Sequence, residues 1–198
     1  MRHGLLYAGV LLLAACGSTP EVRRSGFLDD YSKLAPTEGT RGLWVYRSPD
    51  LDFTRYETLQ VDDAVAWFNP DSEAEDINVV ERKRLTAEFG RAIRNTLRDN
   101  GYQLVDKPSD STLRVRVAIT DLYVRVGPLS TEGDRKGRIR LDGAALEADL
   151  KDSVSGKVLF AVMTTRRGGG VQTLAGSSNQ RVFEYWADQL VELLNESR

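Results

Sequence analysis

The chain has 198 residues and a mass of 22.1 kDa, enough for one globular domain. Hydrophobic residues make up 41% and charged residues 28%, an ordinary composition for a folded domain that excludes disorder throughout the chain. The 27 basic and 29 acidic residues give a net charge of −2, and this balance argues against a nucleic-acid-binding protein, which would gather a basic excess on one face.

Residues 1–15 are typical of a secretory signal peptide. A short basic start precedes an apolar run over residues 5–15, and small residues end it. The run is too short to cross a bilayer as a helix, which needs roughly 20 residues. Its end, Leu13-Ala14-Ala15-Cys16, resembles the lipobox of bacterial lipoproteins. The alternative is that Cys16 is a buried structural cysteine.

The lipobox resemblance implies cleavage before Cys16 and attachment of diacylglycerol to its thiol, followed by acylation of the new amino group. Each buried CH₂ contributes roughly 0.8 kcal/mol, so the usual three acyl chains would anchor the mature chain stably. Gly17 follows the cysteine, whereas an aspartate there commonly retains enteric lipoproteins at the inner membrane. We therefore expect a membrane-anchored protein on the cell outer membrane that faces the periplasm.

The mature chain would lack two of the commonest catalytic side chains. His3 is the only histidine and lies in the signal peptide, and Cys16 is the only cysteine. This excludes Ser-His-Asp and Cys-His catalysis, zinc sites built on His or Cys, and CxxC redox chemistry. Paired carboxylates remain available, but no spacing argues for them. We therefore expect no catalytic residue, no cofactor and no metal.

Residues 16–25 are expected to form the lipidated N-terminus and a tether, because residues 17–25 are polar and contain a proline. We expect residues 26–198 to form a single periplasmic domain. Its first apolar residues, Phe27, Tyr31 and Leu34, with Leu28 beside them, have the spacing of a short helix that ends at Pro36. This segment either docks on its own domain or presents these side chains to a partner.

The same segment, "SGFLDDYSKLAP", resembles the opening of the bacterial lipoproteins grouped as domain of unknown function 3313. Asp52-Phe53-Thr54-Arg55-Tyr56 resembles the run that precedes the first central strand in that family. The likeness extends in layout over most of the mature chain. Because the family has no assigned activity, the resemblance implies a location and a fold more than a function.

Two strands are predicted next, over residues 42–46 and 58–68. A helix of roughly 20 residues should follow, because apolar residues recur in steps of four from Leu85 to Leu97. Asn78 and Glu81 have capping-box spacing at its start, and Asn100-Gly101 marks its end. A short strand over residues 102–105 follows.

A long hairpin is predicted around residue 132. Apolar residues occupy odd positions from Leu113 to Ile119 and even positions from Leu122, and the returning strand reverses this change near Gly143. A one-residue slip turns side chains to the other face of a sheet, and a β-bulge is the usual device for it. We expect the hairpin tip to turn its apolar face away from the core. It would cover another element of the domain or meet a partner through Leu122, Val124, Ile139 and Leu141.

The C-terminal part completes the fold. Residues 158–163 are apolar on both faces and predict a central strand. Phe183, Trp186, Leu190 and Leu193 mark an amphipathic helix. The fold class is therefore α+β, a mostly antiparallel sheet with a long central helix and a C-terminal helix packed on one face.

The leading functional interpretation is a non-enzymatic accessory or protein-binding module of the cell envelope, with an envelope protein as partner and no nucleic acid. One alternative is a carboxylate-based envelope hydrolase, which requires a cleft with two acidic side chains, at least one with a raised pKa. Another is a carrier of a small apolar ligand, which requires a cavity of a few hundred Å³.

Overall fold

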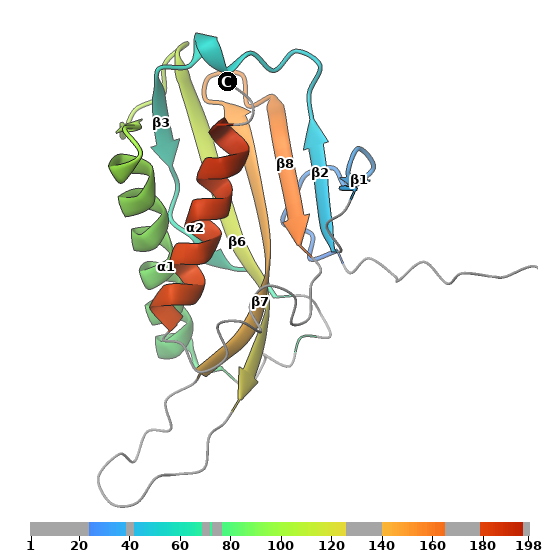
Figure 1. Ribbon diagram of the computed structural model, residues 1–198, viewed down its shortest axis with the longest axis vertical. Coiled ribbons are helices and arrows are strands. Elements are labelled where there is room, and N and C mark those ends of the chain that lie inside the picture. Colours follow the sequence, from blue (N-terminus) through green and yellow to red (C-terminus); the bar gives the residue numbers. More distant parts are fainter. Residues whose placement is uncertain are drawn as a thin grey trace, which may run out of the picture.

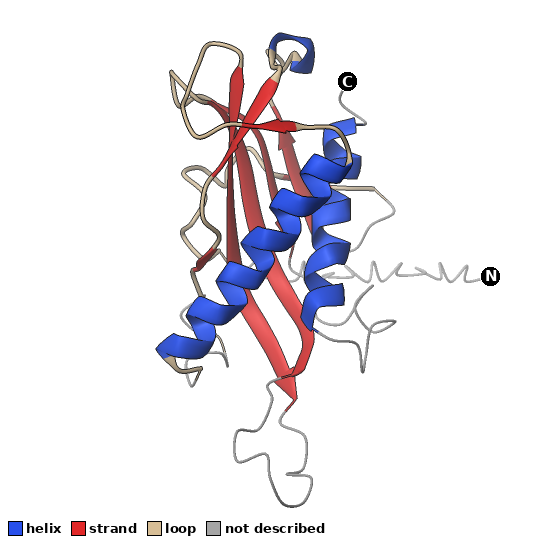
Figure 2. Cartoon of the chain, turned by 90° about the vertical axis from the view of Figure 1, so that its left-hand side faces the viewer, coloured by secondary structure: helices blue, strands red, loops and turns tan. Residues whose placement is uncertain are grey.

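A mixed β-sheet carries two helices on one face (Figures 1 and 2). The computed structural model describes residues 24–38, 42–68, 72, 77–125, 140–164 and 179–195. The helices are α1 (Val79–Asp99) and α2 (Asn179–Asn195), with a short 3₁₀ turn at Phe53–Arg55. The strands are β1 (Ala35–Pro36), β2 (Leu43–Arg47), β3 (Thr58–Val61), β4 (Val65–Ala66), β5 (Gln103–Leu104), β6 (Thr112–Arg125), β7 (Arg140–Asp152) and β8 (Val158–Thr164).

The strand order within the described residues is β1-β2-β8-β7-β6-β3-β5, and β4 pairs with β6. The pairs β1–β2, β2–β8, β8–β7 and β7–β6 are antiparallel. In contrast, β3 runs parallel to β5 and β6, and β4 runs parallel to β6. The predicted α+β class, with both helices on one face of a mostly antiparallel sheet, is confirmed. The predicted strand over residues 58–68 is divided into β3 and β4 by three residues outside regular structure.

Helix α1 forms where the sequence predicts it. The Asn78 Oδ1 atom accepts a hydrogen bond from the backbone N–H of Glu81 at 3.0 Å, which satisfies one of the unpaired amides of the first turn. The residues buried along its inner face are Leu85, Phe89, Gly90, Ile93 and Leu97. Gly101 follows the helix at φ = +82°, a left-handed conformation that glycine adopts without strain.

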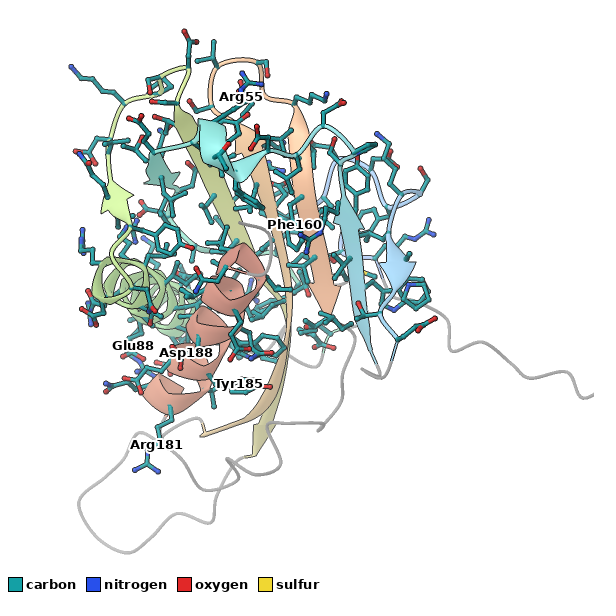
Figure 3. All side chains as sticks on the ribbon, turned by 45° about the horizontal axis from the view of Figure 1, so that its top comes forward. Arg55, Glu88, Phe160, Arg181, Tyr185 and Asp188 are labelled. Atoms are coloured by element: carbon teal, nitrogen blue, oxygen red, sulfur yellow. The ribbon has the colours of Figure 1, made fainter. Side chains whose placement is uncertain are left out.

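Helix α2 packs beside α1 over the centre of the sheet. The rings of Phe89 and Phe183 lie 5.2 Å apart between the two helices. Phe160 on β8 faces the same core, whereas Arg181 points outward from the start of α2 (Figure 3). The face of the sheet under the helices, here called the front face, therefore holds the main hydrophobic core.

The hairpin of β6 and β7 has the predicted centre and contains two register shifts. Ile119 pairs with Leu146 and Asp121 with Ala145, so Thr120 is the extra residue of a bulge. On β7, Gly143 pairs with Tyr123 and Leu141 with Val124, so the extra residue is Asp142. The predicted position of the apolar slip is thus confirmed.

The predicted consequence of the slip is wrong for Leu122. This side chain is 1% exposed and belongs to the same core cluster as Ile119. The bulge at Thr120 adds one residue just where the sequence pattern shifts by one, so the apolar side chains stay on the front face. The side chains of Val124 and Leu141, and all of Ile139, lie outside the described residues.

Residues 24–34, here called the strap, cross the other face of the sheet without forming the predicted short helix. The Tyr31 hydroxyl accepts hydrogen bonds from the backbone N–H groups of Gly26 and Leu28 at 2.8 and 3.2 Å. The Asp30 carboxylate accepts one from the backbone N–H of Ser32 at 2.8 Å. These side-chain acceptors take the place of helical carbonyls, so the helical spacing of the apolar residues was misleading here. The strap then leads into β1.

Candidate functional site

Buried charges line the face of the sheet away from the helices, here called the back face. Side chains alternate along β7, so Leu146 and Leu150 enter the front core while Glu147, Asp149 and Lys151 point backward. Glu147 and Asp149 are each 1% exposed. Buried charges of this kind destabilise a fold unless each one is paired.

The pairing comes from β6 and from the strap. The Arg116 guanidinium forms an ion pair with Asp149, which raises the pKa of Arg116 through the hydrogen bond to that carboxylate. Asp29 of the strap accepts from Lys151 and also lies 3.3 Å from an Arg116 nitrogen. The hydrogen bond from Lys151 is the main cause that lowers the pKa of Asp29. The strap therefore completes a four-membered charge network.

Tyr31 connects the strap to the second buried carboxylate. Its hydroxyl donates to the Glu147 Oε2 atom at 2.6 Å, and the backbone N–H of Ser25 donates to Oε1 at 3.3 Å. Burial is the main cause that raises the pKa of Tyr31, and the hydrogen bond to Glu147 raises it further. The Tyr31 hydroxyl thus stabilises the turn of the strap and also offsets part of the desolvation free energy of the buried Glu147 carboxylate.

A small hydrophobic cluster accompanies these polar contacts. Leu28 and Leu34 are 4% and 9% exposed, and they pack with Ala161 and Met163 on the back of β8. The segment that resembles the family opening is therefore docked on its own domain, and Leu28, Leu34 and Leu122 have no surface left for a partner. The charges on the back of β6 and β7 are the reason that the strap docks there, and the sequence pattern of the strap did not predict them.

Two aromatic side chains mark the place where the strap begins. The rings of Phe27 and Trp67 lie 6.4 Å apart in an edge-to-face arrangement, and the Trp67 indole N–H donates to the carbonyl of Ser25 at 3.1 Å. The Arg116 guanidinium lies 4.9 Å from the centre of the Phe27 ring. Trp67 is 50% exposed and Val65, two residues earlier, is 37% exposed.

A pocket of about 240 Å³ opens on the front face, where the sheet extends beyond α2. Its walls are mostly apolar, and Thr37, Thr164, Gln189 and Glu192 add polar groups. The Trp186 Nε1 atom in this lining is buried and has no hydrogen-bond partner among the described residues. The pocket is lined by Thr37, Leu43, Phe89, Ile93, Val117, Leu146, Glu147, Ala148, Val162, Thr164, Trp186, Gln189, Leu190, Glu192 and Leu193.

Trp186 and Leu193 were predicted to lie on the core side of a helix, but the pocket was not predicted. A pocket at this place depends on how far β2 and β8 extend past α2. The helical periodicity of α2 carries no information on the position of these strands.

No cluster of three metal-ligating side chains occurs among the described residues. Where a described carboxyl group has a displaced pKa, as in Asp29, Asp50 and Asp152, hydrogen bonds lower it. The hydrolase alternative needs a pKa that is raised instead.

No described helix is long and apolar enough to span a membrane. Leu13, Ala14, Ala15 and Cys16 lie outside the described residues.

A family model described as "Protein of unknown function (DUF3313)" matches residues 23–190. The chain therefore belongs to this family, as the resemblance of the strap sequence predicted. No curated protein matches the chain.

Three solved structures are among those that are similar to the chain. The PelC dodecamer from Paraburkholderia phytofirmans is 17% identical, with a TM-score of 0.39, over 72% of this chain and 96% of that one. A minor lipoprotein from Acinetobacter baumannii is 14% identical, with a TM-score of 0.33, over 72% and 95%. A DUF4136 family protein from Bacteroides thetaiotaomicron is 13% identical, with a TM-score of 0.36, over 78% and 92%. Likenesses at this level do not establish a shared function.

Proposed function

We propose that the chain is a lipid-anchored lipoprotein on the periplasmic side of the outer membrane and acts as a non-enzymatic accessory or protein-binding module of the envelope. Support for the anchor comes from the lipobox at Leu13–Cys16 and from membership of a family whose opening segment follows the lipid-bearing cysteine. Support for a non-enzymatic role comes from the composition of the mature chain, which would carry neither histidine nor a free thiol.

The docked strap is the observation that carries this proposal. Asp29 and Tyr31 attach the strap to the charged back face, so Arg24, the first described residue, has a defined place on the domain. Residues 16–24 can span at most about 30 Å. A lipid on Cys16 would hold the domain within that distance of the bilayer, and in a restricted set of orientations.

The anchor is tested by replacing one residue. A Cys16→Ser variant would lose the acceptor of the diacylglycerol, so we expect it to leave the membrane fraction, while the wild-type chain bands with outer-membrane markers on a density gradient. A Ser18→Ala variant is the matched control, since it makes a similarly small change in the tether and leaves the Cys16 thiol in place. Wild-type protein in the soluble fraction would contradict the anchor, and wild-type protein with inner-membrane markers would contradict only the address.

The accessory role is tested by photocrosslinking in cells. A photoreactive residue in place of Gln189, at the rim of the front pocket, should capture one defined envelope protein. The same residue in place of Arg181, which is exposed at the start of α2, is the control and should capture none. The protein is first shown to be lipidated and folded. The binding role would then be contradicted if crosslinking from Gln189 gave no more product than crosslinking from Arg181.

The pocket favours a second candidate function, the carriage of a small apolar ligand. Its volume of about 240 Å³ lies just below the range of about 300–1,000 Å³ that is typical of small-molecule sites, and its walls are mostly apolar. The unpaired indole N–H of Trp186 would be satisfied by one acceptor oxygen on that ligand. A molecule with an apolar body and one carbonyl or hydroxyl oxygen fits these walls.

This candidate is tested with a fluorescent polyene fatty acid as the probe. Ala148→Phe would fill the pocket from β7 and should abolish probe binding, whereas Val154→Phe, at an exposed turn, should leave it unchanged. Equal binding by the two variants would contradict ligand carriage through this pocket.

A further inference from the structure

Two exposed apolar side chains, Val65 and Trp67, and the partly buried Phe27 lie together near Ser25, close to the first described residue of the chain. We propose that Phe27, Val65 and Trp67, here called the aromatic patch, rest on the headgroup–acyl boundary of the same bilayer that holds the lipid of Cys16. This inference rests on the proposed lipid anchor. The occupant of the patch is a lipid surface of zwitterionic phospholipid.

The three side chains share one face of the sheet. Ala64 packs in the front core, so Val65 and Trp67, the first and third residues after it, alternate with Ala66 and lie on the back face. Phe27 of the strap meets Trp67 there. Phe27 is partly buried, whereas Val65 is 37% exposed and Trp67 is 50% exposed although its indole N–H is already bonded. Large apolar side chains that remain exposed side by side usually mark an interaction surface.

The position of the patch relative to the tether identifies the lipid surface as its occupant. The Trp67 indole donates to the carbonyl of Ser25, and residue 24 is the first described residue of the chain. The patch is thus one hydrogen bond away from the start of the tether, which spans at most about 30 Å to Cys16. Of the surfaces of the domain, the one next to the tether meets the bilayer most often.

The surrounding charges fit a zwitterionic interface. Asp29 is paired with Lys151 and Arg116, and Asp62 is paired with Arg114, so these carboxylates do not stand unpaired against the headgroups. Arg24 is exposed, with its guanidinium 5.7 Å from the centre of the Tyr31 ring. Tryptophan is enriched at membrane interfaces, and arginine reaches from there to phosphate groups. A balanced surface of this kind predicts contact that does not depend on anionic lipid.

Fluorescence quenching by brominated lipid tests the inference on the full lipidated protein. Trp44, Trp67 and Trp186 are the three tryptophans, so the variant W44F/W186F reports Trp67 alone and the variant W44F/W67F reports Trp186 on the front face. Both are reconstituted into phosphatidylethanolamine–phosphatidylcholine vesicles, with or without bromine near the top of the acyl chains. We expect bromine to lower the Trp67 emission by about twofold, because an indole at the interface lies close to these atoms. The Trp186 emission should not change.

Co-flotation with the vesicles separates the two claims. Vesicle-bound protein whose Trp67 emission is unaffected by bromine would overturn the aromatic patch and leave the anchor intact. Protein that does not float would overturn the anchor, and the patch with it. The variant V65E, combined with W44F/W186F, should stay anchored, keep its circular dichroism spectrum and lose the Trp67 quenching. Quenching that persists unchanged in V65E would place Trp67 near lipid without the patch and would also overturn the proposal.

Discussion

The two faces of one sheet are stabilised in different ways. On the front face, two helices cover side chains such as Val117 and Leu150, and the stability comes from apolar area removed from water. On the back face, an irregular strap bonds Glu147 through Ser25 and Tyr31. Asp29 of the strap pairs with Lys151 and Arg116, and Arg116 in turn pairs with Asp149. The same strands, β6 and β7, supply both layers through the alternation of their side chains.

The difference predicts how each face responds to change. Apolar packing loses stability in proportion to the volume removed, whereas a buried charge network depends on every member keeping its partner. Damage to the front face should therefore unfold the whole domain. Damage to the back face should first release the strap, and with it the fixed exit of the tether.

The largest effect is expected in the front core. Phe183→Ala removes a ring that is 0% exposed and packs on Phe89, and it should lower the free energy of unfolding by about 3–5 kcal/mol. Urea denaturation followed by circular dichroism measures this loss. A loss below about 1 kcal/mol would show that α2 contributes little to the core. It would contradict the claim that apolar packing stabilises the front face.

The next effect is expected in the charge network. Asp149→Ala leaves Arg116 without its buried partner, and because the Arg116 side chain is 23% exposed we expect a loss of about 3 kcal/mol, the lower end for a broken buried pair. The double variant R116M/D149L removes both charges together and should recover most of this loss in the same urea titration. If the double variant were as unstable as the Asp149→Ala variant, the loss would come from altered side-chain packing and not from an unpaired charge.

A smaller and more local effect is expected from Tyr31→Phe. The change removes the hydroxyl that bonds Glu147, Gly26 and Leu28, at a cost of about 1–3 kcal/mol. Hydrogen exchange should then speed up at the amides of Gly26 and Leu28, while amides of β7 keep their protection. Equal acceleration in both places would show that strap and sheet unfold as one unit.

The smallest effect is a dependence on pH. The pKa of Asp29 is lowered from its ordinary value of 3.8 in the folded chain, so its ion pairs stabilise the strap above that pH and are lost as the pH falls through the lowered value. The variant Asp29→Asn should be less stable than wild type at neutral pH, and the difference should shrink below pH 3.8. A difference that is constant with pH would mean that the charge of Asp29 does not hold the strap.

Local patterns predicted the front face well. The Asn78 cap, the four-residue steps of α1 and the hairpin slip each depend on neighbours along the chain, and each was found in place. The bulge shows the limit of this reasoning, because the slip at Thr120 was located correctly while its effect on Leu122 was reversed. A pattern shift and a bulge at the same place cancel each other, so the predicted bulge keeps the apolar side chains on one face instead of turning them to the other.

The back face could not be predicted in the same way. The strap has helical spacing at Phe27, Tyr31 and Leu34, but its conformation is decided by Glu147 and Lys151, more than a hundred residues later. Nothing in the local pattern around Glu147 and Lys151 indicates that they meet the strap. The pocket beside Trp186 also depends on distant elements, since β2 and α2 meet only in the folded chain.

The covalent state of residue 16 is the most direct test of the functional account. Mass spectrometry of the mature protein from isolated membranes should show a chain that begins at Cys16, with diacylglycerol on the thiol and a further acyl group on the amino group. A chain that keeps residues 1–15, or one that carries an unmodified Cys16 thiol, would contradict the proposed anchor and the orientation that the strap is proposed to impose.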